Sequence, residues 1–424
     1  MPPPPHGYEF GGPLGAFAIS LLVPTVTYIF YFVCSEDGCP SSSFLRDPVG
    51  NIASKWPGLL GVFDWDVMMH YCLWYFGLAV MYFVLPGKTG EGVVLSNGKR
   101  LKYRFNGCTS LLTVVAYCGF MTYREGFQWQ FWAYIWDNYL QLITATFIFS
   151  VSLAFYCYIS SFFTGELLAN DTGNVIYDWF LGRPLNPRIG SFDIKVFSEL
   201  RPGIILWPIL NFAFMAHQYN THGKVTDSMI LVNVFQFWYA YDALHNEPAV
   251  LTTMDVTTDG FGFMLSCGDL MWLPINYSLQ CRYLAMHPFE LGPLGVAGVL
   301  AVQGLGYWIF RSANGQKHEF RTNPNDPKLA HIKYIETKSG SRLMITGWWG
   351  IARHINYLGD WIMAWAWCLP TGYRGPLGYF YVVYFAILLI HRERRDEAKC
   401  KLKYGADWKK YTDVVPSRIV PGIY

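Results

Sequence analysis

The chain has 424 residues, of which 52% are hydrophobic, 18% are aromatic and only 15% are charged. A soluble domain normally carries about 25% charged residues, so this composition argues against a soluble globular protein. The formal net charge of +2 is too small to indicate a partner of either sign, and no nucleic-acid partner is expected.

The N-terminal half alternates between a polar arm, apolar stretches and polar connections. Residues 1–13 hold four consecutive prolines and predict a short disordered arm. A helix of about 20 residues crosses a hydrocarbon core of about 30 Å, so uncharged runs of that length predict membrane spans. Six runs of this kind occur, at 14–34, 67–87, 105–123, 138–165, 202–223 and 291–310. The chain is therefore predicted to be an all-α, polytopic membrane protein.

Charge interrupts the apolar pattern in two later regions, 227–283 and 342–396. An unpaired charge in hydrocarbon costs at least about 2.5–3.5 kcal/mol, so such groups face a cavity, a partner or water. We therefore expect the functional site in these two regions. The alternative is that the charges lie in loops between short helices, and we favour it for Asp227, Asp269 and Arg282.

The distribution of basic residues predicts the topology. Residues 311–342 contain seven Lys/Arg against three Asp/Glu, and residues 391–424 contain nine against five. The connection 88–104 is basic as well, and basic connections mark the cytosolic side. With a pair of spans in 227–283 and two crossings in 345–390, we expect roughly ten spans.

The predicted organisation has three parts. The arm 1–13 precedes N-terminal transmembrane helices at 14–223, and a catalytic half follows at 224–424. That half is expected to hold a basic loop at 311–342, spans at 343–391 and a basic tail at 391–424. Its cofactor site should face the cytosol.

The tail has a pattern that would suit a phosphorylated ligand. If it is helical, Arg392, Asp396, Cys400 and Tyr404 lie on one face at i, i+4 spacing, and Gly405 is a plausible helix stop. Neighbouring Arg and Lys side chains could bind a phosphate. An anchor at the membrane surface explains the same charges, and spacing alone does not separate these interpretations.

Two other stretches combine polar and aromatic residues within apolar surroundings. Residues 347–360 contain Trp, Arg, His, Asn, Tyr and Asp, which suits a cofactor at the membrane edge or an interfacial aromatic belt. Residues 239–260 contain Tyr239 and several carboxylates near apolar walls, which suits a proton donor or helix caps.

The cysteines and histidines do not predict a metal site. None of the ten cysteines forms a CxxC pair, and no HxxxH cluster repeats. Cys34 and Cys39 flank a predicted membrane exit, where a disulfide is a weak expectation. The pair Gly304 and Gly306 is interpreted as a helix-packing contact.

The chain resembles the sterol reductase family of ergosterol and cholesterol synthesis over essentially its whole length. The first family signature matches residues 173–188, GNVIYDWFLGRPLNPR, and the second matches 389–405, LIHRERRDEAKCKLKYG. LTTMD at 251–255, DGFGF at 259–263 and GWWG at 347–350 are also similar. Within the family, YEFGGPLGA at 8–16 and RIVPGIY at 418–424 look most like fungal delta(14)-sterol reductases. The membrane core of the lamin B receptor is related.

The resemblance implies NADPH as cofactor and no metal. It also implies which side chains contact the cofactor, and these are Lys317, Arg321, Met344, Trp349, Asn356, Tyr357, Asp396, Cys400, Lys401, Leu402, Lys403, Tyr404 and Tyr411. At residues 245–248 the chain has His-Asn-Glu-Pro where animal relatives have Trp-His-Glu-Glu.

The implied reaction is reduction of the C14=C15 double bond of an 8,14-diene sterol to the 8-ene sterol, in ergosterol synthesis. Protonation precedes hydride transfer, with Tyr239 and Asp396 as the expected acid system. The alternatives are reduction at C7 or C24(28), or a sterol-binding scaffold without turnover. The implied partners are a sterol and membrane lipid, and the implied location is the endoplasmic reticulum membrane.

Overall fold

The computed structural model describes residues 7–34, 38–373 and 375–424, and its helices dominate over three small sheets. Residues 1–6 of the predicted arm lie outside these ranges. The chain divides into two compact units, Met1–Pro288 (unit 1) and Phe289–Tyr424 (unit 2).

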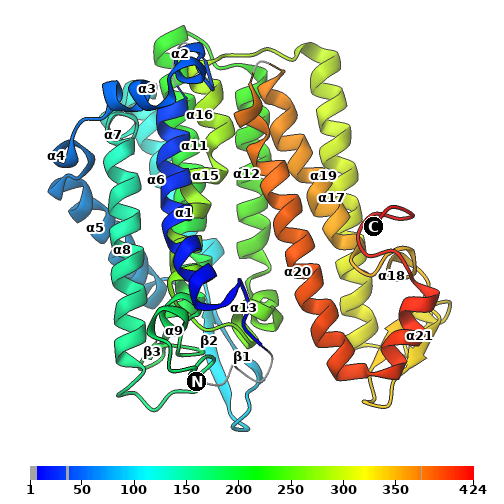
Figure 1. Ribbon diagram of the computed structural model, residues 1–424. Coiled ribbons are helices and arrows are strands. Elements are labelled where there is room, and N and C mark those ends of the chain that lie inside the picture. The colour runs from blue at the N-terminus through cyan, green and yellow to red at the C-terminus, as the bar shows by residue number, and fades with distance from the viewer. Residues whose placement is uncertain (1–6, 35–37, 374) are drawn as a thin grey trace. The chain divides into compact units, whose positions relative to one another are not determined.

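Unit 1 is built on long helices that coincide with the first five uncharged runs, followed by one more (Figure 1). They are α1 (Gly12–Val33), α5 (Trp65–Val84), α6 (Gly107–Glu125), α8 (Tyr139–Ser160), α11 (Pro202–His222) and α12 (Asp227–His245). Side-chain caps fix two of the starts, since Asp64 accepts a hydrogen bond from Val67 N and Thr226 accepts one from Met229 N.

Short helices and strands connect the long helices of unit 1. The helices are α2 (Ser42–Arg46), α3 (Pro48–Lys55), α4 (Leu59–Val62), α7 (Gln130–Asp137), α9 (Val175–Leu181), α10 (Ile194–Leu200), α13 (Met254–Thr257), α14 (Phe263–Cys267), α15 (Leu273–Tyr277) and α16 (Leu279–Met286), with single turns at Gly126–Gln128, Glu247–Thr252 and Gly268–Trp272. The strands form the antiparallel pairs β1 (Lys88–Val94) with β2 (Arg100–Phe105), and β3 (Arg188–Ile189) with β4 (Phe192–Asp193).

Helix α11 lies at the centre of unit 1, where it packs against α7, α12, α15 and α16. Its interior carries amides that bond one another. Gln236 of α12 accepts from Trp207 Nε1 at 3.0 Å and from Asn211 Nδ2 at 2.7 Å, and it donates to Gln280 Oε1 at 3.2 Å. Because buried polar groups need partners in an apolar interior, this network fixes how α11, α12 and α16 face one another.

Unit 2 consists of α17 (Gly292–Thr322), α18 (Trp348–Ile351), α19 (Ile355–Cys368), α20 (Phe380–Tyr404) and α21 (Ala406–Val414), with β5 (Tyr334–Glu336) antiparallel to β6 (Arg342–Met344). Further single turns lie at Pro327–Leu329, Leu369–Thr371 and Pro376–Tyr379. The helical part of the tail prediction is confirmed, because α20 runs unbroken to Tyr404 and ends at Gly405, which has a positive φ, whereas what the tail binds stays a prediction.

Helices α17 and α19 pack in backbone contact through two glycines. A Cβ atom at Gly306 would lie 2.7 Å from Gly359 O and 2.8 Å from Met363 N. A Cβ atom at Gly359 would lie 2.6 Å from Phe310 N and 2.8 Å from Gly306 O. The interpretation of Gly306 as a packing residue is confirmed, whereas it was wrong for Gly304, which is exposed and where an added Cβ atom would meet nothing within 4 Å.

Among the residues that the structure describes, four segments are long and apolar enough to cross a membrane, namely Gly12–Val33, Leu59–Val84, Tyr139–Ser160 and Gly292–Thr322. A polytopic membrane protein is therefore supported, whereas the count of roughly ten spans stays a prediction.

Several local expectations differ from the structure. The fold is not purely helical, because three short hairpins accompany the helices. Helix α17 extends to Thr322, well into the segment 311–342 that was expected to be a loop. Asp269 and Arg282 lie in helical turns, and the buried Arg282 guanidinium lies 4.7 Å from the centroid of Tyr31 and 5.0 Å from that of Tyr139, so the loop interpretation was wrong for both charges.

Two other expectations concern the beginning of the chain. The described part of the N-terminal arm packs against α9, where the ring centroids of Tyr8 and Tyr177 are 4.9 Å apart and Glu9 N donates to Tyr177 Oη at 2.9 Å. The Cys34–Cys39 disulfide is present.

Candidate functional site

The C-terminal end of α17 holds the first part of the candidate site. Lys317 Nζ lies 3.9 Å from the centroid of the Trp349 ring. The Trp349 indole is buried and donates through Nε1 to Ala313 O, one turn earlier on α17, at 2.9 Å. Gln316 accepts from Trp348 N at 2.9 Å. These bonds attach the GWWG turn to α17, and the indole face then holds the half-buried Lys317 ammonium.

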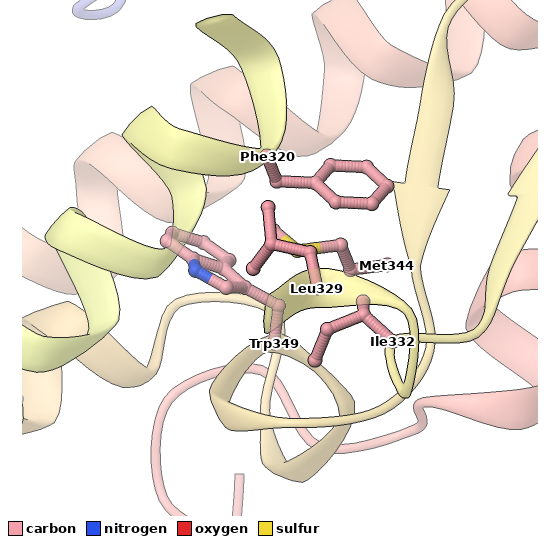
Figure 2. Packing of buried hydrophobic residues seen from close by; sticks show 5 residues of the cluster. All are labelled: Phe320, Leu329, Ile332, Met344 and Trp349. Carbon is pink, nitrogen blue, oxygen red and sulfur yellow. The ribbon is translucent and has the colours of Figure 1, made fainter. Parts of the chain in front are cut away.

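Met344 and Trp349 belong to a hydrophobic cluster rather than to an open surface. The cluster joins them to Phe320, Leu329 and Ile332, and Figure 2 shows the five side chains pointing toward one another. Met344 is only 7% exposed. The cluster therefore explains how residues 329–349, which form no long helix, are held against the end of α17.

The start of α19 supplies a second group of polar atoms. Asn356 donates through Nδ2 to Asn314 Oδ1 of α17 at 3.2 Å. Its Oδ1 atom is buried and has no hydrogen-bond partner within the part of the chain that the structure describes. A buried acceptor without a donor is unfavourable, so this atom can accept from a ligand amide or hydroxyl. Tyr357 stacks on His354, with ring centroids 4.9 Å apart.

Asp396 of α20 lies between His354, which precedes α19, and Cys400, one turn later on α20. His354 Nε2 lies 3.6 Å from Asp396 Oδ2, and Cys400 Sγ lies 3.8 Å from the same oxygen. The Asp396 side chain is 39% exposed, whereas that of His354 is 9% exposed. The carboxylate is thus held from the protein side and open on the other.

The pKa of the Cys400 thiol is shifted by its burial and by the charges of Asp396 and Lys317. Burial raises its pKa to about 12, the Asp396 carboxylate adds to the shift, and the Lys317 ammonium opposes it. Lys317, Asp396 and Cys400 therefore act on one another electrostatically. The thiol is neutral at physiological pH, which makes Cys400 a hydrogen donor here and not a nucleophile.

Tyr411 and Tyr404 extend the site toward α21. Tyr411 is buried and donates from its hydroxyl to Trp349 O at 3.3 Å. Burial raises the pKa of Tyr411 above its usual value, so the phenol stays protonated. Tyr404 stacks on Trp408 with centroids 6.0 Å apart. Cys400 and Tyr404 of α20 pack against a cluster of Trp408, Tyr411 and Val415, which fixes α21 against α20.

Some residues that the resemblance implied lie apart from this group. Lys401 is directed to the Glu397 side of α20, where Nζ lies 3.2 Å from Oε1, and its side chain is 61% exposed. Leu402 is 74% exposed. Arg321 is exposed on the last turn of α17, and Lys403 is exposed with Nζ 5.0 Å from the Tyr404 centroid. The structure brings together Lys317, Trp349, Asn356, Tyr357, Asp396, Cys400, Tyr404 and Tyr411 around the ends of α17, α19 and α20.

Tyr239 lies in unit 1, near the middle of α12. Its ring centroid is 6.2 Å from that of Trp207, whose indole donates to the buried amide network of α11 and α12. The pairing of Tyr239 with Asp396 as one acid system stays a prediction, because the two residues lie in different units.

Sequence reasoning did not identify the contact of His354 with Asp396 or the partners of Arg353 and Glu393. The Arg and His of residues 347–360 were expected in a stretch that suits a cofactor, without assigned contacts, and Glu393 only as part of the basic tail. Arg353 is buried, with Nη2 at 3.5 Å from Glu397 Oε2 and Nη1 donating to Val415 O at 3.3 Å. The available signal was burial, since a charge within an apolar stretch needs a partner.

The chain is similar to known proteins over nearly its whole length. Residues 5–424 match the family described as the Ergosterol biosynthesis ERG4/ERG24 family. The chain is 50% identical over 421 residues to Delta(14)-sterol reductase erg24 of Schizosaccharomyces pombe, covering 98% of this chain and 97% of that protein.

Two further relatives have similar coverage. Delta(14)-sterol reductase of Ascobolus immersus is 50% identical over 425 residues, which is 98% of this chain and 99% of that protein. Delta(14)-sterol reductase ERG24 of Candida albicans is 46% identical over 441 residues, with 98% and 97% covered. The predicted resemblance is confirmed along the full length, and the chain belongs to the Ergosterol biosynthesis ERG4/ERG24 family.

Proposed function

We propose that this protein is a Delta(14)-sterol reductase of ergosterol biosynthesis, which reduces the C14=C15 double bond of an 8,14-diene sterol with NADPH. The observation that carries this proposal is the match, at about half identity and nearly full coverage, to proteins named for that activity. The candidate site of unit 2 supports it, because its polar groups suit a dinucleotide.

The residues of unit 2 fit NADPH on two structural grounds. Asn356 Oδ1, which has no hydrogen-bond partner among the described residues, offers an acceptor to an amide or a ribose hydroxyl. Lys317, held at the Trp349 face, offers a cation to a phosphate. We infer that Lys317, Trp349, Asn356, Tyr357, Asp396, Cys400, Tyr404 and Tyr411 hold the cofactor, with Arg321, Lys401, Leu402 and Lys403 at its exposed edge and Met344 supporting Trp349. Bound NADPH supplies the hydride.

The protein must also provide a proton, because an alkene that carries no electron-withdrawing group is a poor hydride acceptor. Addition of H⁺ to C15 converts the C14=C15 bond into a C–H bond and leaves a tertiary cation at C14. Hydride addition at C14 then completes the reduction, so that one proton and one hydride account for the product. A carboxylate or an aromatic face near C14 lowers the energy of that cation.

Asp396 and Tyr239 are the groups we assign to proton delivery. Asp396 is 39% exposed, so it can take up a proton from solvent, and its contacts with His354 and the Cys400 thiol hold the carboxyl group in place. Tyr239 stands on a helix fixed by the buried amides of α11 and α12. We expect Tyr239→Phe and Asp396→Ala each to abolish turnover of the folded enzyme, whereas Tyr373→Phe, at a 92% exposed position, should not.

Sterol profiling tests the reaction directly. Cells that lack this chain should accumulate 8,14-diene sterols, and its return should clear them. Accumulation of sterols unsaturated at C7 or C24(28) would move the reaction to another double bond. An unchanged profile, with no NADPH oxidation by the purified protein on an 8,14-diene sterol, would favour a sterol-binding scaffold.

We also propose that the protein resides in the endoplasmic reticulum membrane, with roughly ten spans and the cofactor site on the cytosolic side. The four apolar segments and the basic composition of residues 311–342 and 391–424 support this placement. In sealed microsomes, a protease added outside should cleave after the basic residues of the 323–342 segment. Protection of that segment until detergent is added would contradict the orientation.

A further inference from the structure

The last ten residues of the described chain form a closed loop after α21. The backbone N–H groups of Arg418, Ile419 and Val420 all donate to the backbone oxygen of Tyr424, at 2.8, 2.8 and 3.0 Å. Gly422 N donates to Ser417 Oγ at 3.0 Å. Because these bonds satisfy most of its backbone, the loop has a defined shape rather than being a frayed end.

A buried carboxylate of α20 anchors this loop. Glu393 is fully buried, and it accepts from Arg418 Nη1 at 3.1 and 3.3 Å and from Tyr424 Oη at 3.1 Å. Burial would lower the pKa of Arg418, yet the hydrogen bond to Glu393 raises it above its ordinary value. A carboxylate in this position is strongly unfavourable without its partners, so it selects the loop conformation that supplies them.

The same loop holds the segment that precedes α19. Arg353 N donates to Ser417 O at 3.0 Å, and His354 N donates to Arg418 O at 2.7 Å. Arg418 is therefore the connecting residue, since its side chain binds Glu393 while its carbonyl binds the backbone of His354.

The contacts form a continuous path from α20 through the loop and back to α20. The path runs from Glu393 to Arg418, from Arg418 to His354, and from His354 Nε2 to Asp396 Oδ2 at 3.6 Å. Glu393 and Asp396 are three residues apart on one helix, yet Glu393 is buried while Asp396 is open to a ligand. The path thus connects an interior charge to the exposed carboxylate of the site.

We propose that Glu393, through Arg418 and Tyr424, is a positioning group that sets the His354 imidazole against Asp396. This inference rests on the proposed role of Asp396 in the reductase reaction. Glu393 touches neither cofactor nor substrate in this scheme and transfers no proton. Its effect is to limit the backbone positions open to His354 and hence the geometry in which Asp396 is held.

A role in stability alone is the competing explanation, because a buried ion pair also holds α20 to the loop. The two explanations differ in where the effect is transmitted. If Glu393 acts through His354, removing the imidazole removes the path, and a second change at Glu393 has little further effect on the folded enzyme. If the role is only structural, the change at Glu393 has the same effect whether His354 is present or not.

The test is a double-mutant cycle of Glu393→Gln and His354→Ala in the full-length protein, purified in detergent. We expect Glu393→Gln to lower kcat about fivefold, the size of one modest hydrogen bond, with the KM for sterol unchanged. In the His354→Ala background the same change should lower kcat less than about twofold. Equal losses in both backgrounds, or no loss in either, would overturn the proposal.

Two additions keep the test decisive. Tyr424→Phe removes one of the Glu393 bonds and replaces Glu393→Gln if that variant does not fold. The dissociation constant for NADPH is measured for the same four proteins of the cycle. It gives the coupling between Glu393 and His354 even if the enzyme reduces another sterol double bond. Glu125→Gln and Tyr373→Phe, at exposed positions, are matched controls and should leave kcat and NADPH binding unchanged.

Discussion

The ion pair between Arg201 and Glu247 should carry much of the stability of unit 1. The two side chains are 0% and 3% exposed, and Arg201 Nη2 lies 2.6 Å from Glu247 Oε1. Glu247 also accepts from Gly107 N at 2.8 Å, at the start of α6, and Arg201 donates to Asn106 Oδ1 at 3.0 Å. The pair thus connects α6, the junction of α10 with α11, and the turn after α12.

Glu247→Ala removes both hydrogen bonds of the carboxylate and leaves a buried guanidinium. Two bonds that involve a charged partner are together worth about 3–6 kcal/mol. Breaking a buried pair from one side costs about 3–5 kcal/mol in other proteins, which agrees. Arg201 Nε and Nη1 already have no partner among the described residues, so few alternative bonds can compensate. We therefore expect the free energy of unfolding to fall by about 4 kcal/mol.

The assay is unfolding of the purified protein by SDS titration in mixed micelles, followed by circular dichroism. Asp171→Ala is the matched control, because it breaks the Arg183–Asp171 pair, in which Asp171 is 55% exposed. Arg183 keeps its bonds to Ser161, so this control should lose less than about 1 kcal/mol. Equal losses in the two variants, or a loss below about 1 kcal/mol for Glu247→Ala, would refute the reasoning.

Three further outcomes follow from the geometry. Trp349→Phe removes the indole N–H and weakens the cation contact with Lys317. We therefore expect NADPH affinity to fall about three- to tenfold in a fluorescence titration. Unchanged affinity would show that Trp349 does not contribute to cofactor binding. The pKa of the Cys400 thiol is raised from 9.0 to about 12, and only the thiolate reacts with an alkylating reagent. At pH 8, Cys400 should therefore be alkylated about a thousandfold more slowly in the folded than in the unfolded protein. Rates within tenfold of each other, measured by site-resolved mass spectrometry, would contradict this. Lys195 donates to the carbonyls of three residues between 255 and 259 at 2.8–3.0 Å. Lys195→Met should therefore lower the free energy of unfolding by about 3 kcal/mol or more, whereas the exposed Lys55→Met should change it little. Equal values would show that the buried ammonium does not stabilise the protein.

The features that depend on local pattern were predictable from the sequence. Uncharged length identified the long helices, because the cost of burying charge acts on every residue of a span. The i, i+4 spacing of Arg392, Asp396, Cys400 and Tyr404 anticipated the continuous helix α20 and its stop at Gly405. The small residue Gly306 anticipated close helix packing.

The features that depend on distant pairing were not predictable. Arg201 and Glu247 are 46 residues apart, and no local signal links them. His354 acquires its position from Arg418, which is 64 residues later, through a backbone bond that leaves no trace in side-chain chemistry. Arg282 was interpreted as a loop residue because charge is rare in buried helices, yet two aromatic rings accommodate it. A single sequence records which groups need partners but not which partners they find.

The backbone contact between α17 and α19 has a consequence for mutational tolerance. Neither Gly306 nor Gly359 belongs to the predicted cofactor site, but the helices that meet there carry Lys317 and Asn356. Lys317 lies eleven residues beyond Gly306, about 16 Å along the helix axis. Since no side chains separate the two backbones, even one methyl group would push the two helices apart. Because a helix moves as a rigid body, the residues of the site that it carries would shift with it. In a saturation-mutagenesis map of reductase function, alanine at either glycine should therefore be as poorly tolerated as a change in a residue that touches the ligand.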